Sequence, residues 1–285
     1  MKSRIQLALG AFCLLVVAIA PEMAMPTWKQ FPAPPPMPPA DESGFAPVNG
    51  ISMYYAIYGK DNGPPILLIH GGLGSGDVWG FEVPELSERH EVIVADSRGQ
   101  GRSSHNHERL TYHLMAEDYV DLIRYLGVGK VALVGWSDGG IIGLDIAMNH
   151  PEVLSKLFAQ AANISPDGLF SIPSIDPPPP SAAGDSHAAE DVTLHEERRR
   201  AARERAFKRL WATEPNYTAD DLRKISVPTA IVVGDHDEVI RPEHTSFIAE
   251  SIPGAKLIIL KNVAHSALYQ DPQQYVKAID DFIDD

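Results

Sequence analysis

The feature that most limits the fold of this chain is a series of short apolar runs separated by longer segments of helical character. The runs are ILLI at 66–69, VIVA at 92–95, VALV at 131–134, LFAQA at 157–161, AIVV at 230–233 and LIIL at 257–260. Short runs of this kind favour strands that are buried on both faces of a parallel sheet. Helical candidates lie near 111–126, 138–149, 241–251 and 271–283. Because strands alternate with helices, the sequence predicts an α/β fold with a mainly parallel sheet.

The chain divides into a leading segment, a folded core and one insertion. Residues 26–44 are rich in proline and are predicted to form an extended spacer. Apolar residues then alternate over 51–57, which is typical of a half-buried strand. No strand pattern is found from 163 to 223. We therefore predict a core formed by 45–162 and 224–285, with a small helical lid formed by 163–223.

The predicted lid contains Pro177 to Pro180 and then a charged helical stretch from Glu190 to Trp211. Within this stretch, Phe207, Leu210 and Trp211 form an apolar stripe at helical spacing. The stripe favours a solvated helix that rests on the core. The alternative is that the excess of arginines in this helix lines an entrance for anionic groups or contacts a membrane surface.

The first 25 residues have the layout of a secretory signal peptide. Lys2 and Arg4 precede an apolar run from Ile5 to Ala20, and this run is shorter than the roughly 20 residues that span a bilayer. We therefore expect an exported protein, either periplasmic or secreted. Because Pro21 is a poor residue to follow a cleavage site, the alternative is that 1–25 stays in place and anchors the chain to a membrane.

Net charge argues against nucleic-acid binding, and cysteine content argues against thiol-based chemistry. The formal net charge is −14, which gives no electrostatic footprint for nucleic acid, so neither DNA nor RNA is an expected partner. The only cysteine, Cys13, lies in the N-terminal apolar run. The sequence after residue 25 therefore has no cysteine for a disulfide, a metal–thiolate site or a nucleophile. The chemistry is left to oxygen and nitrogen groups.

The segment Gly135-Trp136-Ser137-Asp138-Gly139 places a serine between a buried run and a helical candidate. On a sharp turn from strand to helix, a serine hydroxyl is exposed at the edge of the sheet. Such a turn needs small neighbours, because a Cβ at either flanking glycine would meet other backbone. We predict that Ser137 is a catalytic nucleophile.

Backbone N–H groups near Ser137 are candidates for an oxyanion hole. The helix after the serine points its N-terminus at the site, so the N–H of Asp138 is the first candidate donor. His70, Gly71 and Gly72 follow the run ILLI, and the glycines let N–H groups approach a substrate closely. Gly72 or Leu73 is therefore predicted to supply the second donor, while His70 is interpreted as structural.

A base and an orienting acid follow later in the chain. His265 lies in a short loop after the run LIIL, and a neutral imidazole can take the proton of a serine hydroxyl and return it to the leaving group. Asp237 follows the run AIVV, where a carboxylate can orient that histidine, and Asp235 is its rival. The order Ser137, Asp237, His265 is the one expected when the serine stands on a strand-to-helix turn of this type, called a nucleophile elbow.

Trp136 and Asp138 flank the nucleophile and are candidates for substrate contact. The carboxylate of Asp138 would attract an amino group of a substrate in a partly dry cleft. The alternative is that Asp138 only caps the following helix. His105, His107 and His113 form a further cluster, which we interpret as part of a polar surface loop rather than a metal site. Neither a metal nor an organic cofactor is expected.

Five segments together resemble the α/β-hydrolase fold family. They are HGGLGSG, DSRGQGRS at 96–103, GWSDGG, GDHDEVI and NVAH, and the resemblance spans about 45–285. The acidic residue after the serine is similar to the biphenyl hydrolase-like branch, whose relatives include lactonases and carbon–carbon bond hydrolases. The resemblance implies an eight-stranded sheet flanked by helices and the triad Ser137, Asp237 and His265. It also implies a structural turn at 96–103, with Arg98 tying loops together.

The leading functional expectation is a serine hydrolase that cleaves a small ester or lactone through an acyl-enzyme on Ser137. Carbon–carbon bond hydrolysis and amidase or peptidase action on small substrates use the same triad and stay open. Serine rather than aspartate at the elbow excludes epoxide hydrolases and haloalkane dehalogenases, which need a carboxylate nucleophile. The alternative of another class is a binding protein that holds a ligand without turnover, since fold alone does not decide function. The sequence leaves the substrate and the oligomeric state open.

Overall fold

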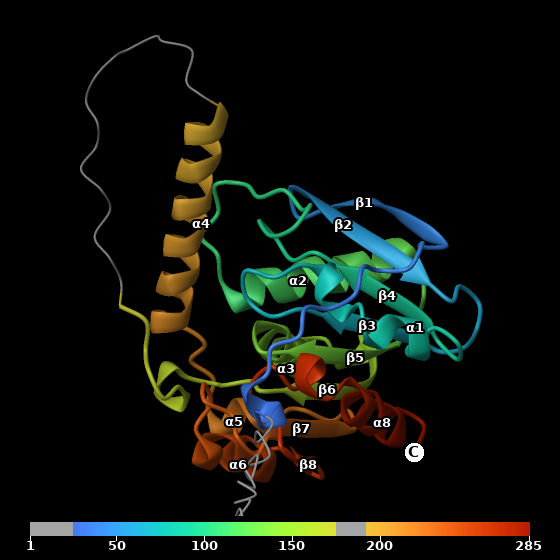
Figure 1. Ribbon diagram of the computed structural model, residues 1–285, viewed down its shortest axis with the longest axis vertical. Helices are drawn as coiled ribbons and strands as arrows, with labels where there is room; N and C mark the ends of the chain where they lie inside the picture. Colours follow the sequence, from blue (N-terminus) through green and yellow to red (C-terminus); the bar gives the residue numbers. More distant parts are fainter. Residues whose placement is uncertain (1–24, 175–191) are drawn as a thin grey trace, which may run out of the picture.

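The computed structural model describes residues 25–174 and 192–285. In this part of the chain, one eight-stranded sheet has the order β1-β2-β4-β3-β5-β6-β7-β8 (Figure 1). The strands are β1 Glu42–Val48, β2 Ile51–Tyr58, β3 Pro65–Ile69, β4 Glu91–Ala95, β5 Val131–Trp136, β6 Leu154–Gln160, β7 Thr229–Gly234 and β8 Lys256–Leu260. β2 is antiparallel to β1 and to β4, and the other pairs are parallel. The α/β class and the mainly parallel eight-stranded sheet are confirmed.

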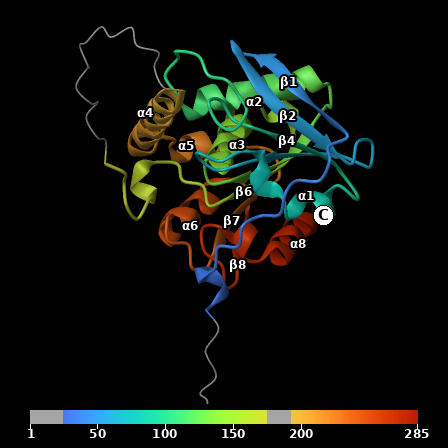
Figure 2. The same ribbon diagram turned by 45° about the horizontal axis from the view of Figure 1, so that its top comes forward.

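Helices cover both faces of this sheet (Figures 1 and 2). One face packs against α2 Tyr112–Leu126, α3 Asp138–Asn149, α5 Ala219–Leu222 and α6 Pro242–Ser251. The other packs against α1 Glu82–Leu86, α7 Ala267–Gln270 and α8 Pro272–Ile283. The helical candidates predicted near 111–126, 138–149, 241–251 and 271–283 correspond to α2, α3, α6 and α8.

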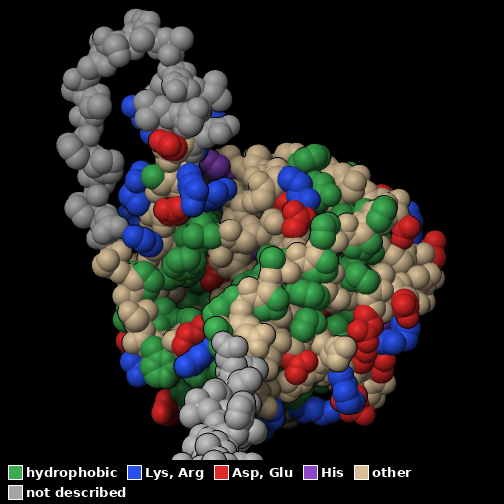
Figure 3. Space-filling model, in the orientation of Figure 1, with side chains coloured by type: hydrophobic (Ala, Val, Ile, Leu, Met, Phe, Trp, Pro, Cys, Tyr) green, Lys and Arg blue, Asp and Glu red, His purple; other side chains and the backbone are tan. Residues whose placement is uncertain are grey.

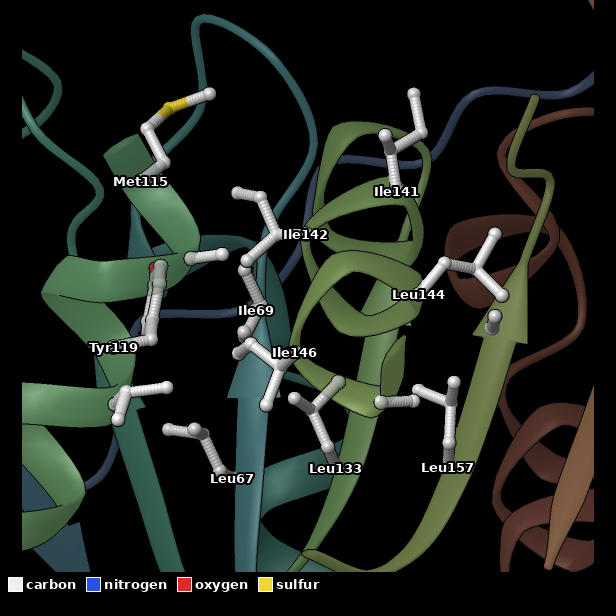
Figure 4. Close-up of a cluster of buried hydrophobic side chains, with 14 of the residues drawn as sticks. Leu67, Ile69, Met115, Tyr119, Leu133, Ile141, Ile142, Leu144, Ile146 and Leu157 are labelled. Atoms are coloured by element: carbon white, nitrogen blue, oxygen red, sulfur yellow. The ribbon is translucent and has the colours of Figure 1, made fainter. Parts of the chain in front are cut away.

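Successive residues of the central strands serve the two faces in turn. Leu67 and Ile69 of β3 pack in the layer under α2 and α3, together with Leu133 and Leu157 (Figure 4). Ile66 and Leu68 point into the opposite layer. Each of these side chains is at most 1% exposed, and burying one contributes about 1.5–3 kcal/mol to stability. This burial on both faces is why the strand sequences read as unbroken apolar runs.

β8 departs from the expectation of burial on both faces. Leu257 and Ile259 are 42% and 48% exposed. The physical reason is position, since β8 is the last strand of the sheet and pairs only with β7. The sequence pattern identified this strand but not its place at the edge.

The folded domain begins earlier than predicted, and the expectation of a spacer at 26–44 needs correction. β1 starts at Glu42 and pairs with β2. The proline-rich segment lies against the core, because the ring of Trp28 stacks on His236 with centroids 4.5 Å apart and Gln270 Nε2 donates to Trp28 O at 2.9 Å. Met37 and Ala40 also pack against the core. A proline-rich segment makes few backbone hydrogen bonds of its own, so such side-chain contacts hold it in place.

The insertion between β6 and β7 contains, in its described part, a 3-10 turn at Pro166–Gly168, the long helix α4 Val192–Thr213 and α5. Phe207 and Leu210 of α4 are 1% and 2% exposed and pack on the core, as the apolar stripe predicts. α4 stands along one side of the core, and its first turns extend beyond it (Figure 1).

Two predictions fall on residues outside the described ranges. These are the signal peptide or anchor, of which 1–24 is not described, and the proline run Pro177–Pro180 within 175–191. In the described ranges, no helix combines the length and the apolarity that a membrane span requires.

Candidate active site

Ser137 stands on the turn between β5 and α3, as the sequence predicts for this segment. Its backbone has φ 54° and ψ −117°, in a region that residues with a side chain rarely adopt. The turn is fixed on both sides, because Ser137 N donates to Gln160 O at 2.8 Å and Ser137 O accepts from Gly140 N at 2.9 Å. Strained backbone of this kind persists where the surrounding structure over-determines it. The hydroxyl is thereby held at the C-terminal edge of the sheet.

The two flanking glycines are required by close approach of backbone. A Cβ on Gly135 would collide with the carbonyl of Gly139, and a Cβ on Gly139 would collide with the carbonyl of Ile69 at the end of β3. These contacts leave no space for a methyl group at either position. The spacing of small residues around the serine is therefore a direct consequence of how tightly β5, α3 and β3 meet.

His265 and Asp237 are brought to the same edge from the loops after β8 and β7. His265 Nε2 lies 3.1 Å from Ser137 Oγ. On the other side of the ring, His265 Nδ1 lies 3.3 Å and 3.2 Å from the two carboxylate oxygens of Asp237. Asp237 Oδ1 also accepts from the N–H groups of Val239 and Ile240, both at 2.8 Å. The structure thus aligns hydroxyl, imidazole and carboxylate in one chain of contacts.

The backbone of His265 is held by three side chains. Its carbonyl accepts from Trp136 Nε1 at 3.0 Å and from Gln160 Nε2 at 3.2 Å, and its N–H donates to Glu238 Oε2 at 3.1 Å. Trp136, predicted to contact substrate, does line the pocket, but its indole N–H is used to fix the histidine loop. The rival acid Asp235 lies instead near Lys261 Nζ, at 3.8 Å.

The candidate oxyanion donors come from the loop after β3 and from the first residue of α3. Gly72 and Asp138 line the pocket beside Ser137. Leu73 is not among the residues that line it; its backbone has φ 61° and the residue is 41% exposed. A Cβ on Gly72 would meet Asp138 Oδ2 at 2.5 Å and Trp211 at 2.6 Å, so a glycine is needed there. His70 is buried, its Nδ1 donates to Gly71 O and its Nε2 accepts from Ser97 N, which is a structural role. Burial lowers the pKa of His70.

The pocket at Ser137 has a volume of about 280 Å³ and mixed chemistry. Its apolar walls are Trp136, Leu169, Pro173, Trp211, Val239 and Ile240. Two carboxylates, Asp138 and Glu214, also line it, and none of the described lining residues is Lys or Arg. The pocket is small, partly apolar and acidic, which suits a neutral or cationic molecule and disfavours an anion.

Asp138 lines the pocket, but its carboxylate is buried and hydrogen-bonded to neighbouring side chains. It is 5% exposed, and its carboxylate accepts from Tyr112 Oη at 2.9 Å and from Trp211 Nε1 at 3.0 and 3.1 Å. Burial raises the pKa of Asp138 to about 6, while the hydrogen bonds from Trp211 and Tyr112 lower it. The carboxylate therefore ties α4 and α2 to the turn that carries the serine. This use was not among the roles considered from sequence.

Sequence reasoning did not identify Tyr112, Trp211 as a pocket residue, or Glu214. In the sequence, Trp211 belongs to the apolar stripe of the predicted lid helix, and no local motif marks the other two. The histidine cluster is also placed by the structure, since His113 Nδ1 lies 2.9 Å from Asp145 Oδ1 and His105 Nδ1 lies 2.9 Å from Asn106 O. Arg98, in the turn at 96–103, does tie loops together: its guanidinium donates to Asn49 O at 3.3 Å and to Asn106 Oδ1 at 2.9 Å.

Comparison with known proteins identifies the family and the fold of the chain. The sequence model described as the alpha/beta hydrolase family matches residues 66–278. The chain is 27% identical to the human serine hydrolase BPHL over 83% of this chain and 84% of that protein. It is 26% identical to the pimeloyl-[acyl-carrier protein] methyl ester esterase of Aeromonas hydrophila, over 78% of this chain and 96% of that protein. In structure it is similar to the enol-lactonase of Burkholderia xenovorans, with a TM-score of 0.68 and 21% sequence identity. The match covers 85% of this chain and 100% of the lactonase chain.

Proposed function

The chain belongs to the alpha/beta hydrolase family, and from this membership and its own site we propose that it is a serine hydrolase that cleaves a small ester or lactone through an acyl-enzyme on Ser137. One observation carries the proposal: His265 Nε2 lies 3.1 Å from Ser137 Oγ while Nδ1 faces the Asp237 carboxylate. This is the geometry in which a base and an orienting acid activate a hydroxyl. Named esterase and lactonase relatives support the choice of bond.

The proposed reaction follows from these contacts. Ser137 Oγ attacks the carbonyl carbon as His265 Nε2 takes the hydroxyl proton, and Asp237 stabilises the imidazolium through Nδ1–H. The N–H groups of Asp138 and of Gly72 or Leu73 are proposed to receive the negative oxygen. His265 then protonates the departing alcohol oxygen. A water molecule, deprotonated by the same nitrogen, attacks the acyl-enzyme and releases the acid.

The acidic lining of the pocket supports a restriction on substrate charge. Asp138 and Glu214 line the cavity, and burial raises the pKa of Asp138 to about 6, so its carboxylate titrates just below neutral pH. We propose that uncharged esters and esters that carry an amino group are accepted over esters with a carboxylate near the scissile bond. The comparison uses alanine, propionate and succinate esters of one alcohol. Faster turnover of the succinate half-ester would contradict the proposal.

Labelling with a fluorophosphonate probe tests the nucleophile directly. We expect one adduct on the peptide that contains Ser137, together with hydrolysis of p-nitrophenyl acetate and butyrate by the unlabelled protein. Prior labelling should abolish that hydrolysis. A folded protein that neither takes up the probe nor hydrolyses these esters is instead a ligand-binding member of the family.

The place of action is a proposal from sequence. Lys2, Arg4 and the apolar run from Ile5 to Ala20 support export from the cytoplasm. Intact mass of the protein purified from cell fractions tests this. Loss of about the first 20–25 residues indicates a cleaved signal peptide, and the full mass in the membrane fraction indicates an anchor.

A further inference from the structure

A second cavity lies along α4, apart from the pocket at Ser137. One wall is a face of α4, and the other comes from residues 98–99, 105–106 and 108–110 in the loop after β4. Its volume is about 470 Å³, and it shares no lining residue with the catalytic pocket. Leu210 lines this cavity whereas its neighbour Trp211 lines the catalytic pocket. We call this cavity the α4 groove.

The α4 groove has an apolar floor. The residues of α4 that line it recur at helical spacing, as in Arg199, Ala202, Arg203, Ala206, Phe207 and Leu210. Ala202 and Ala206 are exposed, and their small side chains leave the space that forms the groove. Phe207 and Leu210 are buried beneath it, and Leu110 adds apolar surface from the opposite wall. A hydrocarbon chain finds contact on this floor without displacing any core residue.

Four arginines surround the floor: Arg199, Arg203 and Arg209 from α4, and Arg109 from the loop. Figure 3 shows Lys and Arg side chains gathered along this helix. Arg109 Nη2 lies 3.4 Å from Glu214 Oε1. Among the carboxylates whose side chains the structure describes, none lies within ion-pairing distance of Arg199, Arg203 or Arg209. Cations crowded at one concave site repel one another, and an anionic ligand relieves that repulsion.

Glu108, the acidic residue among the described residues that line the groove, forms its ion pair with Arg98 and not with these four arginines. Glu108 lies 3.5 Å from Arg98 Nη1, and it accepts a hydrogen bond from Asn106 Nδ2 at 3.1 Å. Arg98 is 2% exposed, and its guanidinium also donates to the buried carboxylate of Asp118. The charge of Arg98 is therefore paired with a carboxylate inside the fold. The positive potential of the groove comes from the exposed arginines on its rim.

We propose that the α4 groove binds a single-chain amphiphilic anion, a hydrocarbon chain that ends in a carboxylate or a phosphate. Guanidinium groups donate paired hydrogen bonds that match these two anions in shape. Each methylene buried on the floor tightens binding about fourfold. The catalytic pocket suits the same ligand poorly, because Asp138 and Glu214 line it. The proposal does not rest on the chemistry at Ser137.

Calorimetric titration of the purified protein with sodium dodecanoate, kept below its micellar concentration, tests the proposal. We expect one site that binds dodecanoate at least tenfold more tightly than dodecyl maltoside, which has the same chain without charge, or acetate, which has the same charge without the chain. Binding should weaken in 1 M NaCl, since the rim arginines are exposed to solvent.

Matched variants locate the site. Arg199→Gln with Arg203→Gln should weaken dodecanoate binding tenfold or more. Arg200→Gln with Arg205→Gln removes the same charge from α4 outside the groove and should leave it within twofold. Ala206→Trp fills the groove and should abolish binding. An unchanged circular dichroism spectrum and unfolding midpoint show that this variant is folded.

Three results would overturn the proposal. The first is equal affinity for dodecanoate and dodecyl maltoside, and the second is equal loss of affinity in the two double variants. The third is no binding of dodecanoate combined with sedimentation on phosphatidylglycerol vesicles that depends on Arg199 and Arg203, which assigns the arginines to a membrane surface. Each result is obtained without turnover, so it stands whether or not the protein is an esterase.

Discussion

The C-terminal edge of the sheet and the insertion after β6 contribute to the same pocket in different ways. At the sheet edge, Ser137, Asp237 and His265 each lie within a few residues of a strand end, and backbone contacts fix them. From the insertion, Trp211 and Glu214 reach the pocket because α4 packs on the core. In the proposed mechanism, the first region positions the reacting atoms and the second shapes the space around them. We therefore expect substitutions at the edge to change kcat and substitutions in the insertion to change KM.

Removing the nucleophile is the strongest way to test this division. Ser137→Ala keeps the turn between β5 and α3 but removes the hydroxyl that is proposed to form the acyl-enzyme, so we expect kcat for p-nitrophenyl butyrate to fall by about 10⁶. KM should change little, because the walls of the pocket remain. Circular dichroism and the unfolding midpoint serve as controls for the fold. A variant that keeps more than a hundredth of the activity would show that another group attacks the ester.

Substitution of the orienting acid should have the next largest effect. Asp237→Asn keeps an oxygen that accepts from the N–H groups of Val239 and Ile240, so the loop is retained. The amide cannot stabilise the imidazolium as a carboxylate does, and we expect kcat to fall by about 10⁴. Asp235→Asn is the matched control and should stay within about threefold of the unsubstituted enzyme. Equal losses in both variants would contradict the assignment of Asp237.

Asp138 stands at the boundary of the two regions, and its titration measures the coupling between them. Its pKa is about 6 in the folded protein and about 3.8 when unfolded. Between these values the folded state binds more protons, so this group makes stability fall as pH rises from about 4 to 6. A shift of about two pKa units corresponds to roughly 3 kcal/mol.

The Asp138→Asn variant isolates this contribution because an amide does not titrate. We expect the fall in unfolding free energy between pH 4 and pH 7 to be smaller in this variant by up to about 3 kcal/mol. Urea unfolding at four pH values measures it. Asp281→Asn, at an exposed carboxylate bound by Lys277, is the control and should follow the unsubstituted protein. Parallel pH profiles for Asp138→Asn and the unsubstituted protein would show that burial does not perturb this group.

The sequence predicts most of the core, because the constraints on the core act between residues that are close in the chain. Gly135 and Gly139 are needed where backbone meets backbone, and such contacts leave a readable pattern within five residues. The apolar runs likewise record burial on both faces of each strand. Where a strand lies at the edge, as with β8, the same pattern carries no information about position, because edge and centre differ only in neighbours distant in sequence.

The pocket walls were not predictable for the opposite reason. Tyr112 and Trp211 meet at Asp138 although 99 positions separate them in the chain, and only packing of α4 brings them together. Nothing in the spacing of either residue marks this contact. From sequence, the carboxylate of Asp138 is predicted to bind a substrate amine or to cap a helix, because both of its donors, Tyr112 and Trp211, are distant in the chain. Local sequence patterns thus predict candidate catalytic residues better than they predict the residues that form the walls of the pocket.

The smallest predicted effect concerns the contact between insertion and elbow. Trp211→Phe keeps the aromatic contact with Phe207 but removes the indole N–H that Asp138 accepts, a charged hydrogen bond worth about 1.5–3 kcal/mol. Because α4 is then less firmly held beside the pocket, we expect KM to rise about threefold to tenfold while kcat stays within about twofold. Trp79→Phe is the matched control, since the Trp79 Nε1 has no hydrogen-bond partner in the described ranges and lies outside the pocket. It should lower stability without changing KM. A loss confined to kcat in Trp211→Phe would mean that the insertion positions the reacting atoms after all.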